Sequence, residues 1–285
     1  MKSDEGYELI DSGFERRLDR FGPYILDRPA PQAFWKPQLS KKHWKNAHAK
    51  FERSSSGGGK WKFMKKLPER WIVKIVDFEM IISPTGFGHV GAFPEQTENL
   101  RLIQQRIKTL NRKIEVMNLF GYTGAATLAA SKAGAELCHV DASKGIVKWG
   151  RDNAKQAGLT ERPIRWMVED VIKFLKREIR REHFYHGLVL DPPTFGRGNK
   201  GEVWKIESDL PELLLHCREV LHKKPDFVIL STYSPKFTPH VLGNMLDDAF
   251  GDLNGTIEST EMLLPETSRN RQMPNGVTAR WLAKR

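Results

Sequence analysis

Two glycines and an acidic residue form the most informative chemical pattern in this chain. The apolar run 115–120 ends at Gly121 and Gly124, and small and apolar residues follow at helical spacing. This order predicts a strand, a tight turn and a helix, the opening unit of an α/β nucleotide-binding sheet. Glycine is expected in the turn because a Cβ would block close approach of the backbone to a ligand. Asp141 ends the next apolar run, where an acid can accept both hydroxyls of an adenosine ribose.

A second motif, Asp191–Phe195, reads Asp-Pro-Pro-Thr-Phe at the end of another apolar run. Two consecutive prolines keep the backbone extended and remove two N–H donors. The segment would present rigid carbonyls and one carboxylate to a nitrogen of a base, while Phe195 stacks on its face. The alternative is that the prolines merely terminate a strand. A further acidic pair, Glu169–Asp170, follows the run 166–168 and could accept a hydrogen bond from an adenine amino group.

Regular alternation of strands and helices is expected to position these residues. Strands are predicted at 114–119, 136–141, 163–168, 186–191 and 226–231, and helices at 94–111, 125–134, 143–157, 170–182 and 208–223. Such alternation implies a parallel sheet covered on both faces, with ligands bound beyond the carboxyl ends of the strands. Two strands, Thr256–Leu264 and Gly276–Leu282, predict a terminal antiparallel hairpin.

Residues 1–92 predict a small β-rich domain that precedes a larger domain, 93–285. Short strand-like runs near 7–10, 24–26, 71–76 and 80–82 are separated by Gly-Pro, Arg-Pro and Lys-Pro steps. The Ser-Gly run 54–59 predicts a mobile loop.

The net charge of +11 and the pI near 9.6 favour a polyanionic partner. Ten Lys or Arg residues and only one acid, Glu52, lie between Lys36 and Lys66. Cations that follow phosphates and rings that stack on bases are typical of a nucleic-acid groove, so residues 1–92 are expected to bind RNA. The alternative is that the rings form a small core and the lysines are merely solvated. The interleaved rings are Trp35, Trp44, Phe51, Trp61 and Phe63.

Composition limits the other classes of protein. No apolar stretch approaches the length of a membrane helix, and the N-terminus lacks the apolar core of a signal peptide, so we expect a soluble cytoplasmic protein without a membrane partner. The two cysteines, Cys138 and Cys217, suit a reducing compartment. Neither has a neighbour at metal-ligand spacing, and no metal site is expected.

Together these motifs resemble the class I S-adenosylmethionine-dependent methyltransferases, over about residues 94–285. More narrowly, Asn118–Gly124 with Asp191–Phe195 is similar to the bacterial 23S ribosomal RNA methyltransferase family, which has guanine-N7 and cytosine-C5 branches. The resemblance implies a Rossmann-like sheet, S-adenosylmethionine as cofactor and RNA, specifically 23S rRNA, as partner. It also implies that Phe120 and the two glycines hold the methionine end, Asp141 the ribose and Asp170 the adenine. The cofactor-binding set is then Gln96, Asn118, Phe120, Gly121, Gly124, Asp141, Ala142, Asp170, Val171 and Asp191, and the catalytic set is Asp191, Pro192 and Phe195.

The residues also bear on which atom is methylated. Cytosine C5 is a weak nucleophile, so its methylation needs a cysteine thiolate to attack C6 first. Tyr233 stands where that cysteine would be expected, and the predicted positions of Cys138 and Cys217 exclude both as substitutes. A purine nitrogen already carries a lone pair, and the Asp-Pro-Pro-Thr-Phe form favours guanine N7. Exocyclic amines also fit, although the aromatic residue comes one position later than in the usual amino-methylating pattern.

Other functions remain open at this stage. The chain could methylate a protein or a small molecule, or it could be a catalytically silent RNA-binding assembly factor. A nicotinamide dehydrogenase fits least, because the helix after Gly124 offers no third glycine. The segment 196–201 is expected to be mobile, and it could close over the substrate and bring Arg197 or Lys200 to a phosphate. The oligomeric state is left open.

Overall fold

The computed structural model of the protein describes residues 6–54, 58–197 and 203–285, with only the backbone of Arg197. The chain divides into two compact units. The first contains Met1–Thr97 and Leu263–Asn275, and the second contains Glu98–Met262 and Gly276–Arg285. That residues 1–92 and 93–285 form two separate domains stays a prediction. In the structure, the first unit also includes the tip of the C-terminal hairpin.

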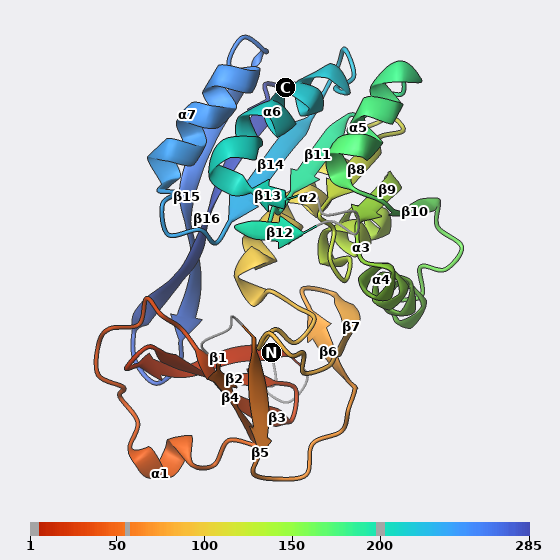
Figure 1. Cartoon of the computed structure of the whole chain (residues 1–285). Coiled ribbons are helices and arrows are strands. Elements are labelled where there is room, and N and C mark those ends of the chain that lie inside the picture. The colour runs from red at the N-terminus through yellow and green to blue at the C-terminus, as the bar shows by residue number, and fades with distance from the viewer. Residues whose placement is uncertain (1–5, 55–57, 198–202) are drawn as a thin grey trace. The chain divides into compact units, whose positions relative to one another are not determined.

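The second unit is built on a mostly parallel sheet with strand order β10-β9-β8-β11-β14-β16-β15 (Figure 1). Leu119 at the end of β8 pairs with Val140 of β9 and with Leu190 of β11, so the carboxyl ends of these strands are level. The antiparallel strands are the last two, β15 and β16, and their far ends belong to the first unit. The strands are β8 (Glu115–Leu119), β9 (Glu136–Asp141), β10 (Ile164–Val168), β11 (Gly187–Leu190), β14 (Phe227–Thr232), β15 (Gly255–Glu266) and β16 (Arg271–Ala283).

Helices cover both faces of this sheet. Apolar side chains of α5, α6 and α7 pack on one face, and those of α2 and α3 pack on the other. The predicted Rossmann-like class I fold is therefore confirmed. Two features were not predicted from the sequence: helix α7, and the strand pair β12 (Phe195–Arg197) and β13 (Val203–Lys205). The helices are α2 (Thr97–Lys108), α3 (Ala125–Lys132), α4 (Lys144–Gln156), α5 (Val171–Arg180), α6 (Ile206–Glu219) and α7 (Pro239–Phe250).

The first unit is β-rich, as predicted, and its strands run in the order β15-β1-β2-β3-β4-β5, beside a separate β6-β7 hairpin. Strand β2 was not predicted because its sequence is polar. Its charges are paired inside the unit, where Asp19 forms ion pairs with Arg17 and with Arg28 of β3. The elements are β1 (Tyr7–Gly13), β2 (Arg16–Phe21), β3 (Tyr24–Pro29), α1 (Lys41–Trp44), β4 (Ala49–Arg53), β5 (Gly59–Phe63), β6 (Trp71–Ile75), β7 (Phe78–Ile82) and the 3-10 turn η1 (Pro94–Gln96).

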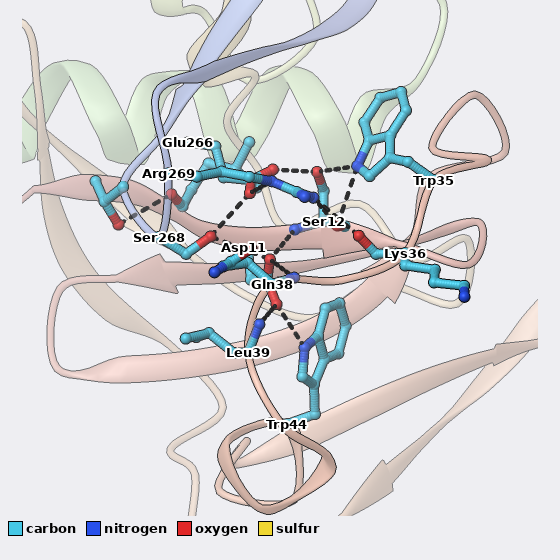
Figure 2. Close-up of polar contacts among 12 residues, drawn as sticks. Asp11, Ser12, Trp35, Lys36, Gln38, Leu39, Trp44, Glu266, Ser268 and Arg269 are labelled. Carbon is cyan, nitrogen blue, oxygen red and sulfur yellow. Dashed lines mark hydrogen bonds and ion pairs between the residues drawn. The ribbon is translucent and has the colours of Figure 1, made fainter.

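A buried carboxylate on β1 organises one end of the first unit (Figure 2). Asp11 is fully buried and accepts five hydrogen bonds, including one of 2.9 Å from the indole of Trp44 and one of 3.1 Å from the Ser268 hydroxyl. Nearby, Glu266 accepts from Arg269 at 2.6 Å. Because an unpaired buried carboxylate is costly, these donors fix the segment before β4 and the hairpin tip against β1. The other donors to Asp11 are the backbone amides of Ser12, Gln38 and Leu39.

No helix within the described ranges has both the length and the apolar character needed to cross a bilayer.

Candidate active site at the strand ends

The predicted site residues of the second unit come together at the carboxyl edge of its parallel sheet. The strand order places the ends of β10, β9, β8 and β11 in succession. Asp170, Asp141, the glycine turn and Asp191 follow these strands in that same order. Ligands of open α/β sheets bind at this edge, so the arrangement provides one continuous site.

The turn after β8 has an unusual backbone. Phe120, Tyr122 and Gly124 all have positive φ, at 55°, 49° and 93°. The left-handed region costs an L-residue about 1 kcal/mol or more, and such strain gathers at functional sites. The turn is closed by the amide of Gly124, which donates to the carbonyl of Gly121 at 3.0 Å. Gly124 then serves as the N-terminal cap of α3.

The two glycines of this turn are required for different reasons. At Gly124 the backbone angle demands glycine, while the space around a Cβ is ordinary, with its nearest atom at 3.6 Å on Trp166. At Gly121 the angle is permissive, but a Cβ would lie 2.6 Å from Nδ1 of His139. At Gly121 a Cβ would therefore clash with the protein interior beneath the turn, and the expected close approach of a ligand from above stays a prediction.

A buried polar chain supports the turn from below. The amide of Asn118 donates to the hydroxyl of Thr127 at 2.9 Å, and that hydroxyl lies 2.9 Å from Nδ1 of His139. All three side chains are buried, and burial lowers the pKa of His139 to about 3, so its ring is neutral. The side chain of Asn118 thus helps to hold α3 and β9 under the turn, and its part in cofactor binding stays a prediction.

Asp141 connects the end of β9 to the turn. One carboxylate oxygen accepts from the backbone amide of Tyr122 at 3.1 Å, and the other accepts from that of Ser143 at 2.9 Å. Burial raises the pKa of this carboxyl, and the two hydrogen bonds act in the opposite direction. Each oxygen retains a further lone pair for a ligand hydroxyl. Ala142 is exposed next to it.

Asp170 performs a structural task that the sequence analysis did not assign. Its side chain caps α5 by accepting from the amide of Lys173 at 2.9 Å, and it remains exposed. Val171 is buried in the core, so only its backbone is available to a ligand. Neighbouring Glu169 is held in an ion pair with Arg177 at 2.5 Å.

The Asp191–Phe195 segment starts beside the turn, since the amide of Asp191 donates to the carbonyl of Leu119 at 3.4 Å. Pro192 is buried, and Phe195 is 52% exposed, as a stacking role requires. The expected row of rigid carbonyls stays a prediction, and two of these carbonyls already accept one hydrogen bond each. The carbonyl of Pro193 already accepts from the indole of Trp204 at 2.6 Å.

The next carbonyl of this segment is also occupied, because that of Thr194 accepts from the amide of Ile206 at 3.2 Å. A carbonyl oxygen has two lone pairs, so both carbonyls retain acceptor capacity beside the Asp191 carboxylate and the Phe195 ring. Trp204 was absent from the sequence-based site. A single tryptophan beyond a glycine-rich run carries no spacing that would place it here.

Three other groups complete the account of the site. Gln96 lies in η1 of the first unit, half-buried, and its part in cofactor binding stays a prediction. Cys138 and Cys217 are both buried, and burial raises the pKa of Cys138 to about 11 and that of Cys217 further. Lys200 lies outside the described residues, as does the side chain of Arg197, so the predicted lid stays a prediction. Within the described ranges, no three His, Cys, Asp or Glu side chains gather to hold a metal ion.

In the basic stretch of the first unit, most of the aromatic rings have structural roles. Phe51 is 1% exposed and packs against Trp61, with ring centroids 5.3 Å apart. Trp35 and Trp44 donate hydrogen bonds to Ser12 and Asp11 of β1 (Figure 2). Only Phe63 is strongly exposed, at 59%. The core alternative therefore fits Phe51, whereas Trp35, Trp44 and Trp61 are half-buried and their stacking on RNA stays a prediction. The lysines and arginines of the stretch are exposed except for Lys50.

Comparison with known proteins identifies the relatives of this chain. Residues 90–237, slightly more than half of the chain, match the model of the S-adenosylmethionine-dependent methyltransferase family. The chain is 37% identical to the S-adenosylmethionine-dependent methyltransferase from Agrobacterium tumefaciens, with a TM-score of 0.94 and coverage of 99% of this chain and 91% of that one. The methyltransferase SMU.776, whose structure contains SAH, has the same fold, with 18% identity, a TM-score of 0.74 and coverage of 99% and 76%.

A curated relative is "Ribosomal RNA large subunit methyltransferase K/L" from Pseudoalteromonas translucida. The two are 27% identical over 180 residues, which cover 61% of this chain and 24% of the relative. The match thus spans about a quarter of the length of that much longer protein.

Proposed function

The chain belongs to the S-adenosylmethionine-dependent methyltransferase family, and from that premise we propose that it methylates a purine nitrogen of 23S ribosomal RNA, with guanine N7 favoured. S-adenosylmethionine is its cofactor and supplies an electrophilic methyl group carried on a sulfonium. The observation that carries the proposal is the Asp191–Phe195 segment, which leaves β11 directly beside the glycine turn of β8. The Asp191 carboxylate and the exposed ring of Phe195 are the groups of this segment that we assign to the target side.

The residues at the strand ends fit the cofactor. Asp141 keeps acceptor capacity for the ribose hydroxyls after bonding two backbone amides. Phe120, Gly121 and Gly124 would hold the methionine end, where the strained turn offers backbone groups. Asp170 and the backbone of Val171 would contact the adenine. This assignment follows the family resemblance, and the geometry of each residue is compatible with it.

The chemistry favours a nitrogen nucleophile. A cytosine C5 mechanism needs a thiolate, and both cysteines of the chain are buried with raised pKa values. Guanine N7 needs only alignment, because its lone pair lies in the plane of the ring and no proton is lost. An exocyclic amine loses a proton on methylation, and Asp191 would accept its hydrogen. Phe195 would hold either base by stacking.

RNA as the substrate is supported by the name of the curated relatives and by the charge of the first unit. We assign the RNA contact to the β5 surface, defined as Lys60, Lys62, Phe63, Lys65 and Lys66. All five side chains are exposed, and β5 is the last strand of its sheet. Lys62 lies opposite Lys50 in the strand pair, and Lys50 is paired with Glu52 at 3.2 Å, so Lys60 and Lys62 are the cations of β5 that we assign to phosphate.

The function is tested by incubating the protein with methyl-labelled S-adenosylmethionine and RNA from cells that lack this gene. The RNA is supplied free and as ribosomal subunits, and the labelled nucleoside is identified by mass. We expect the label on a guanine at N7 of 23S RNA. Label on an exocyclic amine would support RNA methylation by this protein but change the proposed target atom. Label at a pyrimidine C5, or in protein or small molecules alone, would refute the proposal.

The β5 surface is tested separately by replacing Lys60 and Lys62 with glutamine. The slope of log Kd for RNA against log salt concentration should fall by about 1.4, because about 0.7 is lost for each of two phosphate contacts with a single strand. Lys108→Gln with Lys223→Gln, exposed positions of the second unit, is the matched control for charge and should leave the slope unchanged. Equal slopes for both pairs would remove the β5 surface from the RNA contact.

A further inference from the structure

One side chain contacts both halves of the site in the second unit. Trp204 lies on β13, where it pairs with Gly196 of β12. Its indole N–H donates to the carbonyl of Pro193 at 2.6 Å, and its ring lies 5.3 Å from that of Phe120, at an angle of 49°. Phe120 belongs to the cofactor turn, and Pro193 belongs to the segment that faces the target.

The Asp191–Phe195 segment needs such an external hold. Pro192 and Pro193 have no N–H, so neither can be anchored by its own amide. The anchors instead come from downstream, through Trp204 and through the amide of Ile206. Ile206 is fully buried at the start of α6, and the amide of Lys205 just before it donates to Asp209 at 2.7 Å. The base of the β12–β13 hairpin is therefore fixed to α6.

The other contact of Trp204 supports the cofactor turn. Phe120 has a φ of 55°, which an L-residue adopts only when its surroundings compensate. Its ring packs on Trp204, and both lie against the core formed with α5, α6 and α7. A tilted aromatic pair of this kind adds attraction beyond the buried area.

We propose that Trp204 is a positioning residue that couples the cofactor turn to the Asp191–Phe195 segment. Its ring holds Phe120, and its N–H sets the position of the Pro193 carbonyl. The cofactor turn and the Asp191–Phe195 segment thereby keep a fixed position relative to each other. The inference rests on the proposed role of Asp191–Phe195 at the target side. Trp204 itself need not touch either substrate.

Two variants separate its two contacts. Trp204→Phe keeps an aromatic ring beside Phe120 and removes the hydrogen bond to Pro193, so affinity for S-adenosylhomocysteine should stay within about twofold. The turnover number for RNA methylation should fall about tenfold, the cost of one such bond in the transition state. Trp204→Ala removes both contacts and should weaken S-adenosylhomocysteine binding as well.

The matched control is Trp71→Phe in the first unit. Trp71 also donates an indole N–H to a backbone carbonyl, that of Phe21, at 3.0 Å. This variant should leave turnover and S-adenosylhomocysteine affinity unchanged. Urea unfolding of all variants corrects each rate for the folded fraction. Unchanged turnover in Trp204→Phe would overturn the inference, as would a loss that only follows lost folding or lost cofactor affinity.

Hydrogen exchange gives a readout that does not depend on the methyl acceptor. In the wild type, S-adenosylhomocysteine should slow exchange both at Phe120–Gly124 and at Thr194–Arg197. In Trp204→Ala at saturating S-adenosylhomocysteine, protection should persist in the first segment and disappear from the second. Persistence in both would overturn the coupling. Failure of the wild type to methylate RNA would instead refute the proposed substrate, and the exchange result would still decide the role of Trp204.

Discussion

The glycine turn and the Asp191–Phe195 segment lie on adjacent strands, yet they are made rigid in opposite ways. The turn is held from beneath, by the buried chain of Asn118, Thr127 and His139 and by a carboxylate that binds its amide. The backbone of the segment is stiffened by the rings of its two prolines, and hydrogen bonds from Trp204 and Ile206 anchor it from the side. The first design resists change because it is part of the core. The second leaves the exposed ring of Phe195 at the surface.

The largest effect should come from Gly121→Ala. Its Cβ would lie 2.6 Å from Nδ1 of His139, in an interior that cannot yield freely, so stability should fall by about 3 kcal/mol and S-adenosylhomocysteine binding should be lost. Urea unfolding measures the loss of stability, and calorimetry measures the loss of S-adenosylhomocysteine binding. Gly145→Ala, in the first turn of α4 with no atom within 4 Å of its Cβ, is the control and should be neutral. A tolerated alanine at position 121 would mean that the turn is not supported from below.

The neutral state of His139 predicts a pH dependence. Its folded pKa of about 3 lies below the unfolded value of about 6.5, so the unfolded chain takes up the proton first as the pH falls. The contribution of neutral His139 to the free energy of unfolding is present in full above pH 6.5 and declines toward pH 3. Between pH 7 and pH 5 the decline is about 2 kcal/mol. Urea unfolding of the wild type and His139→Gln at both pH values isolates this amount, because other histidines are common to both. Equal declines would show that His139 does not titrate in this way.

Gly124→Ala should have a smaller effect than Gly121→Ala. The Cβ at this position meets only ordinary contacts, and the cost is that of a positive φ, about 1 kcal/mol. The free energy of unfolding measures it, and S-adenosylhomocysteine binding should weaken without being abolished. If position 124 proved the more sensitive of the two, backbone angle rather than interior crowding would govern the turn.

The smallest effect should come from Pro193→Ala. Alanine keeps the carbonyl that Trp204 binds, so stability should fall by less than about 1 kcal/mol through the freer unfolded chain. Turnover should fall only a few-fold in the same RNA methylation assay. A loss as large as that of Trp204→Ala would assign the rigidity of the segment to its prolines and not to its lateral anchors.

The sequence was sufficient for the parts of the fold that depend on local pattern. The alternating apolar runs and the glycine turn predicted each parallel strand and the site edge, since parallel strand ends meet there. Helix α7 was missed although Thr238 and Pro239 form a standard helix start, with the Thr238 hydroxyl accepting from Val241. That signal was present and could have been used.

Other features depend on partners that are distant along the chain. Strand β2 looks polar until Arg28 of β3 is placed beside Asp19. Trp204 has no local signature because its partners, Phe120 and Pro193, arrive through the tertiary fold. The indole of Trp44, one of the rings in the basic stretch, donates to the distant Asp11, a bond that no local spacing predicts. Such assignments require knowledge of which segments meet.

The hairpin tip shared by the first unit has a consequence for synthesis. Asp11 and Glu266 are among the first and last parts of this unit to be translated, and Ser268 and Arg269 are their donors. Residues 6–97 therefore emerge from the ribosome long before 263–275, and Asp11 lacks its Ser268 donor until then. A nascent chain arrested before residue 263 would expose an incomplete first unit to proteases, whatever the state of the second.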